Sequence, residues 1–243
     1  MESLTRDHFF NGKIVLNQPA SGYRFSIDAV ILSHLACPAP CETVLDLGTG
    51  CGVIPVMLAF RHPEIRVIGV EIQPSLSRLA RRNVADNCLS DRVQIVDKDI
   101  GKLLLADIGG PVDWVVTNPP YRKRGSGRIN TDSQRAVARH ELKTDLDTVL
   151  RTARRMLRKS GRFSIIYPSV RSIDLLTAMR STGIEPKYLT MIHAKPALPA
   201  RLVVVTGIKG GRPGLDVGPP LGLYHEDGTY TRALESMFSG LTD

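Results

Sequence analysis

The chain has 243 residues, enough for one large domain with a full hydrophobic core, and 42% of them are hydrophobic. No apolar run approaches the length that spans a membrane, which argues against a membrane protein. The net charge of +8 and the pI near 9.5 favour a polyanionic partner such as a nucleic acid.

Cysteine usage and the N-terminus bear on the compartment and on metal binding. His34, Cys37 and Cys41 lie close together, but a fourth ligand with zinc-like spacing is missing. We therefore expect no metal site and free thiols. Residues 1–7 have neither the basic nor the apolar region of a signal peptide, so we expect a cytoplasmic protein.

Residues 1–40 precede the first central strand and are expected to form a hairpin followed by a helix. Asn11-Gly12 lies between short apolar runs, which is a hairpin signal. Residues 27–36 have the composition of a short helix, for which Ser26 is a candidate N-cap. Farther along, apolar strands alternate with helical patterns, which predicts an α/β fold with a parallel sheet covered on both faces.

A glycine-rich turn follows the first central strand. Val44–Leu47 is apolar apart from Asp46, and Gly48, Gly50 and Gly52 follow at alternate positions. Glycines permit positive φ, and the start of the next helix offers unpaired N–H groups to a carboxylate or a phosphate. The spacing is not that of dinucleotide-binding folds, so a pyrophosphate ligand is not favoured. Asp46 is expected mainly to stabilise the turn by accepting backbone N–H bonds.

Acidic residues follow or end the next two strands. Residues 67–71 form the second strand, and its last residue, Glu71, is placed to accept hydrogen bonds from ribose hydroxyls. The third strand is expected at 92–96. Asp97 and Asp99 follow this strand, and each is a candidate acceptor for the hydrogens of a ligand's amino group.

The fourth strand, residues 112–117, ends in Asn118-Pro119-Pro120-Tyr121. Pro119 favours an extended backbone at Asn118, and neither proline has an N–H group. The turn therefore presents an amide side chain, a free carbonyl and an aromatic ring to one small pocket. Asn118 Oδ1 and the Pro119 carbonyl can accept the two hydrogens of a planar amino group while Tyr121 stacks on its face. The alternative is an ordinary turn at the end of a strand.

Positive side chains are concentrated after this turn. Between Tyr121 and Arg162 the chain has thirteen positive and four negative side chains. The first four positive side chains lie in a glycine-containing loop beside this proposed pocket, where we expect contacts with nucleic-acid phosphates. These residues are Arg122, Lys123, Arg124 and Arg128. Most of residues 151–159 is expected to be a solvated helix face instead.

The other elements complete one domain that spans residues 1–243. Helices are expected at 53–60, 74–87, 145–158 and 173–181, and strands at 162–167, 188–193 and 202–208. Residues 210–243 are expected to form a C-terminal tail. No internal repeat, linker or second domain is evident.

These motifs resemble those of class I S-adenosylmethionine-dependent methyltransferases. The resemblance rests on residues 46–52, Glu71, Asp99 and 118–121. It implies a Rossmann-like fold with a mostly parallel seven-stranded sheet and helices on both faces. It also implies S-adenosylmethionine as the cofactor. The implied cofactor-binding residues are Asp46, Gly48, Gly50, Gly52, Glu71, Asp99, Arg24 and Asp28, and the implied catalytic residues are Asn118, Pro119 and Tyr121.

Three further segments, residues 22–30, 138–141 and 223–230, resemble bacterial tRNA adenine-N6 methyltransferases. Members of that family modify the adenine beside the anticodon of a valine tRNA, so the resemblance implies a tRNA partner. The expected reaction needs alignment of the exocyclic nitrogen with the methyl group, but no metal and no covalent enzyme intermediate. The alternatives are a ribosomal RNA guanine-N2 methyltransferase, a protein glutamine N5-methyltransferase and a non-catalytic RNA-binding module.

Overall fold

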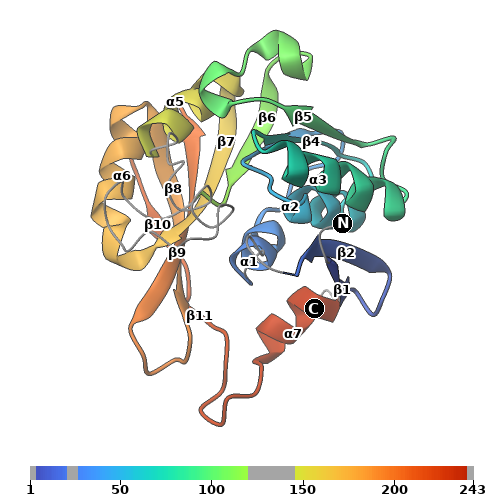
Figure 1. Cartoon of the computed structure of the whole chain (residues 1–243). Coiled ribbons are helices and arrows are strands. Elements are labelled where there is room, and N and C mark those ends of the chain that lie inside the picture. The colour runs from blue at the N-terminus through green and yellow to red at the C-terminus, as the bar shows by residue number, and fades with distance from the viewer. Residues whose placement is uncertain (1–3, 21–26, 120–145, 240–243) are drawn as a thin grey trace, which may run out of the picture.

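The computed structural model describes residues 4–20, 27–119 and 146–239 (Figure 1). Within these residues the chain forms a separate two-stranded hairpin and one nine-stranded sheet. The strands of the large sheet are β3 (Thr43–Leu47), β4 (Arg66–Glu71), β5 (Val93–Asp97), β6 (Val112–Thr117), β7 (Leu157–Pro168), β8 (Ile184–His193), β9 (Ala200–Lys209), β10 (Asp216–Val217) and β11 (Leu221–Gly222).

The large sheet is mostly parallel, as predicted. Its strand order is β10-β8-β9-β7-β6-β3-β4-β5, and β11 also pairs with β8. Among these strands only β9 runs antiparallel to its neighbours β7 and β8. The seven longer strands are the seven that the fold prediction implied. The two additional ones, β10 and β11, have two residues each, which is too short for a sequence pattern to indicate.

Helices cover both faces of the sheet, and each face has its own hydrophobic core. On one face lie α1 (Ile27–Leu35), α2 (Val53–Arg61) and α3 (Pro74–Asp86). These helices pack on strand residues that share their core, such as Val44 and Val67. The other face carries α5 (Leu146–Met156) and α6 (Ser172–Ser181), which pack on residues such as Leu45 and Ile68. Successive residues of one strand therefore enter different cores, as expected for a strand buried on both sides.

The N-terminal hairpin consists of β1 (Leu4–Phe9) and β2 (Ile14–Pro19), which pair antiparallel. Phe10, Asn11 and Gly12 all have positive φ, at 52°, 55° and 82°, so the Asn-Gly signal correctly predicted the turn. The C-terminal helix α7 (Arg232–Ser239) lies beside this hairpin (Figure 1). The Phe10 N–H donates to the Phe238 carbonyl at 2.6 Å, and the rings of Phe9 and Phe238 stack with centroids 5.8 Å apart.

One expectation about the second half of the chain was wrong. The helix expected to reach residue 158 ends at Met156, because Leu157 already pairs with Val112 as the first residue of β7. Sheet pairing thus overrides the helical pattern. Residues 210–243, for which the prediction gave no secondary structure, contain α7, whose Leu234 and Met237 enter the core of the α1 face. Among the described residues, no helix has the length and apolar character needed to cross a membrane.

The burial of α7 leads to a prediction about stability. Leu234 is fully buried, so Leu234→Ala should lower the free energy of unfolding by about 2–4 kcal/mol through lost burial and a residual cavity. The neighbouring Glu235 is exposed, and Glu235→Ala should change it by less than about 0.5 kcal/mol. Urea unfolding of both variants measures the difference. Equal values would mean that α7 does not contribute to the core.

Candidate active site

The carboxyl ends of three adjacent strands bring the candidate residues together. β3 pairs in parallel with β4 on one side and with β6 on the other. The hydroxyl of Thr117, the last residue of β6, donates to the Leu47 carbonyl at the end of β3 at 2.8 Å. The glycine turn, Glu71 and Asn118 therefore all lie at the same edge of the sheet, where open α/β folds bind ligands.

The glycine turn has the backbone conformation that its sequence predicts. Gly48, Gly50 and Gly52 have φ values of 79°, 58° and 85°, a region that L side chains rarely adopt. The N–H groups of Gly48 and Thr49 both donate to the Val70 carbonyl of β4, each at 2.9 Å. Gly52 is the N-cap of α2. The turn thus follows the neighbouring strand closely before the helix starts.

Glu71 holds the same turn through its side chain. Its Oε2 accepts from the Gly50 N–H at 2.8 Å, and its Oε1 accepts from the Gln73 N–H at 2.8 Å. The residue is only 6% exposed. Burial raises the pKa of Glu71, and the backbone N–H bonds oppose this rise. Each carboxylate oxygen has more than one lone pair, so the side chain retains capacity for a ligand's hydroxyl groups.

Asp46 does not play the part that the sequence suggested. Its side chain is fully buried in β3, and neither carboxyl oxygen has a hydrogen-bond partner among the described residues. Burial raises the pKa of Asp46 to about 7, with the Thr49 side chain opposing the rise and the Glu71 carboxylate adding to it. The N–H groups of the turn go to Val70 and Glu71 instead. An unpaired buried carboxyl of this kind requires a special explanation.

Asp97 and Asp99, the two candidate acceptors at the end of β5, have different surroundings. Asp97 is the last residue of β5, where it accepts from the Ser77 hydroxyl and pairs with Arg81 at 3.0 Å. The Ser77 hydrogen bond, more than any other contact, lowers the pKa of Asp97. Asp99 lies beyond the strand, is half-buried, and accepts from the Gly101 N–H at 2.9 Å. Asp97 is thus bound to α3, while the hydrogen bond of Asp99 to Gly101 lies within its own turn.

The proline turn, which begins with Asn118 and Pro119, starts at the end of β6, as predicted. Asn118 is half-buried and Pro119 is buried. Trp114 of the same strand donates from its indole N–H to the Ser164 hydroxyl of β7 at 3.0 Å. Side chains of β6 thus bond to both neighbouring strands, Thr117 to β3 and Trp114 to β7. This leaves little freedom in the backbone that presents Asn118.

Several predicted site residues lie outside the described part of the chain. They are Arg24, Tyr121, Arg122, Lys123, Arg124 and Arg128. Asp28 is described and lies in the first turn of α1, where a carboxylate interacts favourably with the helix dipole. Among the described residues no three His, Cys, Asp or Glu side chains converge as metal ligands.

Sequence reasoning missed Asn83, which reaches the glycine turn from α3. Its Nδ2 donates to the Cys51 carbonyl at 2.8 Å. The signal was present, since Leu76, Leu79 and Ala80 mark the buried face of α3 and Asn83 follows on that face. A polar residue at such a position needs partners in the interior. Sequence spacing alone does not indicate which partners these are.

Comparisons with known proteins agree on the family. The sequence profile described as "Methyltransferase small domain" matches residues 27–179. A protein of Porphyromonas gingivalis named tRNA1(Val) (adenine(37)-N6)-methyltransferase is 34% identical over 196 residues, which are 78% of this chain and 76% of the relative. A Haemophilus influenzae protein of the same name is 28% identical, with 90% of each chain covered.

Solved structures give the same fold. The structure of a predicted O-methyltransferase from Agrobacterium tumefaciens superposes with a TM-score of 0.69 at 23% identity, covering 88% of this chain and 96% of that one. Geranyl diphosphate C-methyltransferase from Streptomyces coelicolor A3(2) gives a TM-score of 0.54 at 16% identity, with 74% and 78% covered. At these identities the likeness concerns the fold alone. The chain belongs to the methyltransferase small domain family, and within it to the family of these tRNA1(Val) (adenine(37)-N6)-methyltransferases.

Proposed function

We propose that this protein transfers a methyl group from S-adenosylmethionine to the exocyclic N6 of adenine 37 in a valine tRNA. The relatives carry this activity in their names. The observation that carries the proposal is the bond from Thr117 to the Leu47 carbonyl. It places the start of the Asn118-Pro119 turn directly beside the start of the glycine turn, so that an amino group and a methyl donor can meet at one edge of the sheet.

The residues at this edge fit S-adenosylmethionine. The cofactor carries a positive sulfonium and an ammonium group, and Asp46 is a buried carboxyl whose oxygens have no partner among the described residues. We assign the ribose hydroxyls to Glu71, the adenine amino group to Asp99 and the methionine end to the glycine turn, with Arg24 and Asp28 covering it. Asp97 is the weaker candidate for the adenine, because Ser77 and Arg81 already engage its carboxylate.

Asn118 and Pro119 then act on the methyl acceptor. The adenine N6 is a poor nucleophile, because its lone pair is delocalised into the ring. Acceptance of its two hydrogens by Asn118 Oδ1 and the Pro119 carbonyl favours a pyramidal nitrogen whose lone pair is free to attack. When bound, the sulfonium would supply the methyl electrophile and a neutral thioether leaving group, and the displaced amino proton would pass to solvent. Alignment is the main contribution of the chain, worth up to about 7–11 kcal/mol in well-oriented systems.

The substrate side of the proposal rests on residues outside the described ranges. Tyr121 is proposed to stack on the flipped adenine. Arg122, Lys123, Arg124 and Arg128 are proposed to contact tRNA phosphates. We further propose that residues 1–243 act as one domain, with 1–40 as an N-terminal extension and 210–243 as a C-terminal one. The protein would work in the cytoplasm, where tRNA is modified.

The function is tested by nucleoside mass spectrometry. Purified protein, S-adenosylmethionine and unmodified valine tRNA should yield N6-methyladenosine in the anticodon loop. The same tRNA with guanine at position 37 should yield none, because it has no adenine amino group at that site. Methylation of ribosomal RNA guanine or of protein glutamine in parallel reactions, without methylation of the tRNA, would overturn the proposal.

Glu71 provides a prediction about cofactor affinity. Glu71→Ala removes both the acceptor for Gly50 and the proposed acceptor for ribose, so it should weaken binding of S-adenosylhomocysteine at least about tenfold. The matched control is Asp97→Ala, since Asp97 is the register partner of Glu71 on the adjacent strand. That variant should retain affinity within about twofold. Isothermal titration calorimetry measures both, and unchanged affinity in a folded Glu71→Ala protein would remove Glu71 from the site.

Asn118 provides a prediction about chemistry. Asn118→Ala removes an acceptor that matters most when the amino nitrogen becomes pyramidal. Its single-turnover rate at saturating cofactor should fall about 100-fold or more, while the Kd for tRNA changes by less than about threefold. Filter binding in parallel separates the two effects. A normal rate in this variant would show that the turn merely ends a strand.

A further inference from the structure

Asn83 is completely buried, and its side chain joins two parts of the molecule. Its Oδ1 accepts from the backbone N–H of Asn17 at 2.8 Å and from Asn17 Nδ2 at 3.1 Å. Its Nδ2 donates to the Asn17 carbonyl at 2.8 Å and to the Cys51 carbonyl at 2.8 Å. All four hydrogen-bonding positions of the amide are therefore used. Three of these bonds go to the N-terminal hairpin and one goes to the glycine turn.

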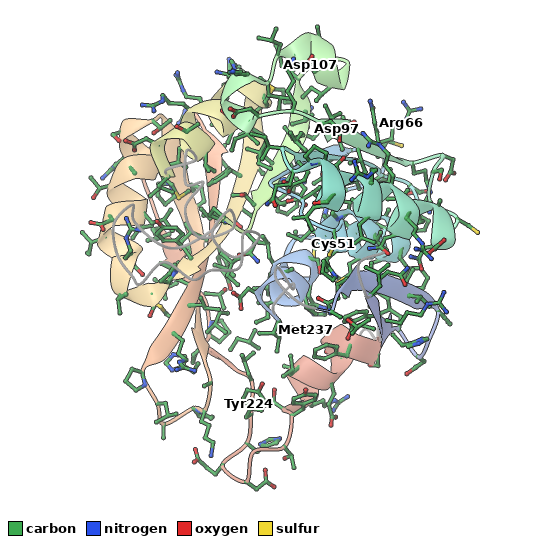
Figure 2. All side chains as sticks on the ribbon, in the orientation of Figure 1. Cys51, Arg66, Asp97, Asp107, Tyr224 and Met237 are labelled. Atoms are coloured by element: carbon green, nitrogen blue, oxygen red, sulfur yellow. The ribbon has the colours of Figure 1, made fainter. Side chains whose placement is uncertain are left out.

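The Cys51 carbonyl needs a hydrogen-bond donor from outside α2, the helix that follows it. Gly52 is the N-cap of α2 with φ of 85°, and its carbonyl accepts the first bond of the helix, from Val56 at 3.1 Å. The Cys51 carbonyl precedes this ladder, and Cys51 is only 1% exposed. A buried carbonyl without a donor is costly, and Asn83 supplies the donor. Cys51 lies between α3 and the hairpin (Figure 2).

Helix α3 approaches the turn closely at this point. A Cβ atom on Gly52 would lie 3.1 Å from Ala80 Cβ, so α3 packs directly against the turn. On its other side the turn is held by Glu71 and by the Val70 carbonyl of β4. The turn is thus fixed from two directions, by β4 and by α3.

Asn87 makes a similar contact with the hairpin but not with the turn. One helical turn after Asn83, its Oδ1 accepts from the Val15 N–H at 2.9 Å and its Nδ2 donates to the Val15 carbonyl at 2.8 Å. Both asparagines therefore satisfy backbone groups of β2. Among the two, Asn83 alone has a hydrogen bond to the glycine turn. This difference separates a purely structural contact from one that involves the cofactor region.

We propose that Asn83 is a positioning residue for the cofactor, through which the docked N-terminal hairpin holds the glycine turn in its binding conformation. The inference rests on the proposed binding of S-adenosylmethionine at that turn. The bonds from Asn17 fix the orientation of the Asn83 amide, and the amide in turn fixes the Cys51 peptide. Because linkage is reciprocal, cofactor binding also stabilises the contact between hairpin and α3.

The first test compares Asn83→Ala with Asn87→Ala by calorimetric titration with S-adenosylhomocysteine. Asn83→Ala should weaken binding about tenfold, the equivalent of one hydrogen bond to a correctly placed peptide. Asn87→Ala should alter affinity by less than about twofold, although it also removes hydrogen bonds to the hairpin. The Tm of each variant is measured alongside. Loss of affinity in proportion to Tm in both variants, or no loss in either, would overturn the proposal.

A second variant preserves the volume of the side chain. Asn83→Asp still accepts from the Asn17 N–H but cannot donate to the Cys51 carbonyl, so it should weaken S-adenosylhomocysteine binding at least as much as Asn83→Ala. In steady state its KM for S-adenosylmethionine should rise about tenfold, while kcat and the KM for tRNA stay within about twofold. A fall in kcat alone would contradict a role in positioning the cofactor.

The wild-type protein provides a test that does not depend on the folding of any variant. Saturating S-adenosylhomocysteine should slow deuterium exchange at the Asn17 amide more than at the Val15 amide, because only the former is bonded to Asn83. Equal slowing at both would overturn the proposal. These measurements need no RNA. A wild type that binds S-adenosylhomocysteine but methylates no tRNA would refute the proposed function and leave this inference intact.

Discussion

The constraint on which the site depends is the backbone of the glycine turn. Three glycines with positive φ turn the chain between β3 and α2, and this leaves N–H and carbonyl groups that no regular element satisfies. Their partners come from elements distant in sequence: Glu71 and Val70 on β4, and Asn83 on α3. The conformation of the turn is therefore a property of the assembled sheet and helix, and local sequence only permits it.

The strand order places this turn beside the end of β6, which carries the residues proposed to bind the methyl acceptor. β3 lies between β4 and β6, and the Thr117 hydroxyl ties the end of β6 to the Leu47 carbonyl. Small shifts of β6 are resisted by Trp114, whose indole is hydrogen-bonded to Ser164 on β7. An enzyme that works mainly by alignment needs such rigidity, because its rate depends on the relative position of two reactants.

Two carboxyl groups at this edge differ in how the protein treats them. Glu71 is buried but accepts backbone N–H bonds, which offset part of the cost of its charge. Asp46 accepts no such backbone bonds among the described residues, and burial raises its pKa to about 7 although the Thr49 side chain opposes the rise. A carboxyl left in this condition is suited to a cationic ligand, which would supply the missing partner. The pair therefore favours a cofactor with positive charge over an anionic one.

Local sequence was sufficient for features that depend on local physics. The bounds of β6 at 112–117 agree with the prediction, as does the hairpin turn at Asn11-Gly12. Tertiary structure decided the rest: the burial of the Asp46 carboxyl, the end of α5, the burial of α7, and the bond from Asn83 to Asn17, 66 positions away. A turn or a strand pattern is set by neighbours in the chain, whereas a buried polar group is defined by whichever distant segment supplies its hydrogen bonds, and spacing along the sequence does not encode that contact.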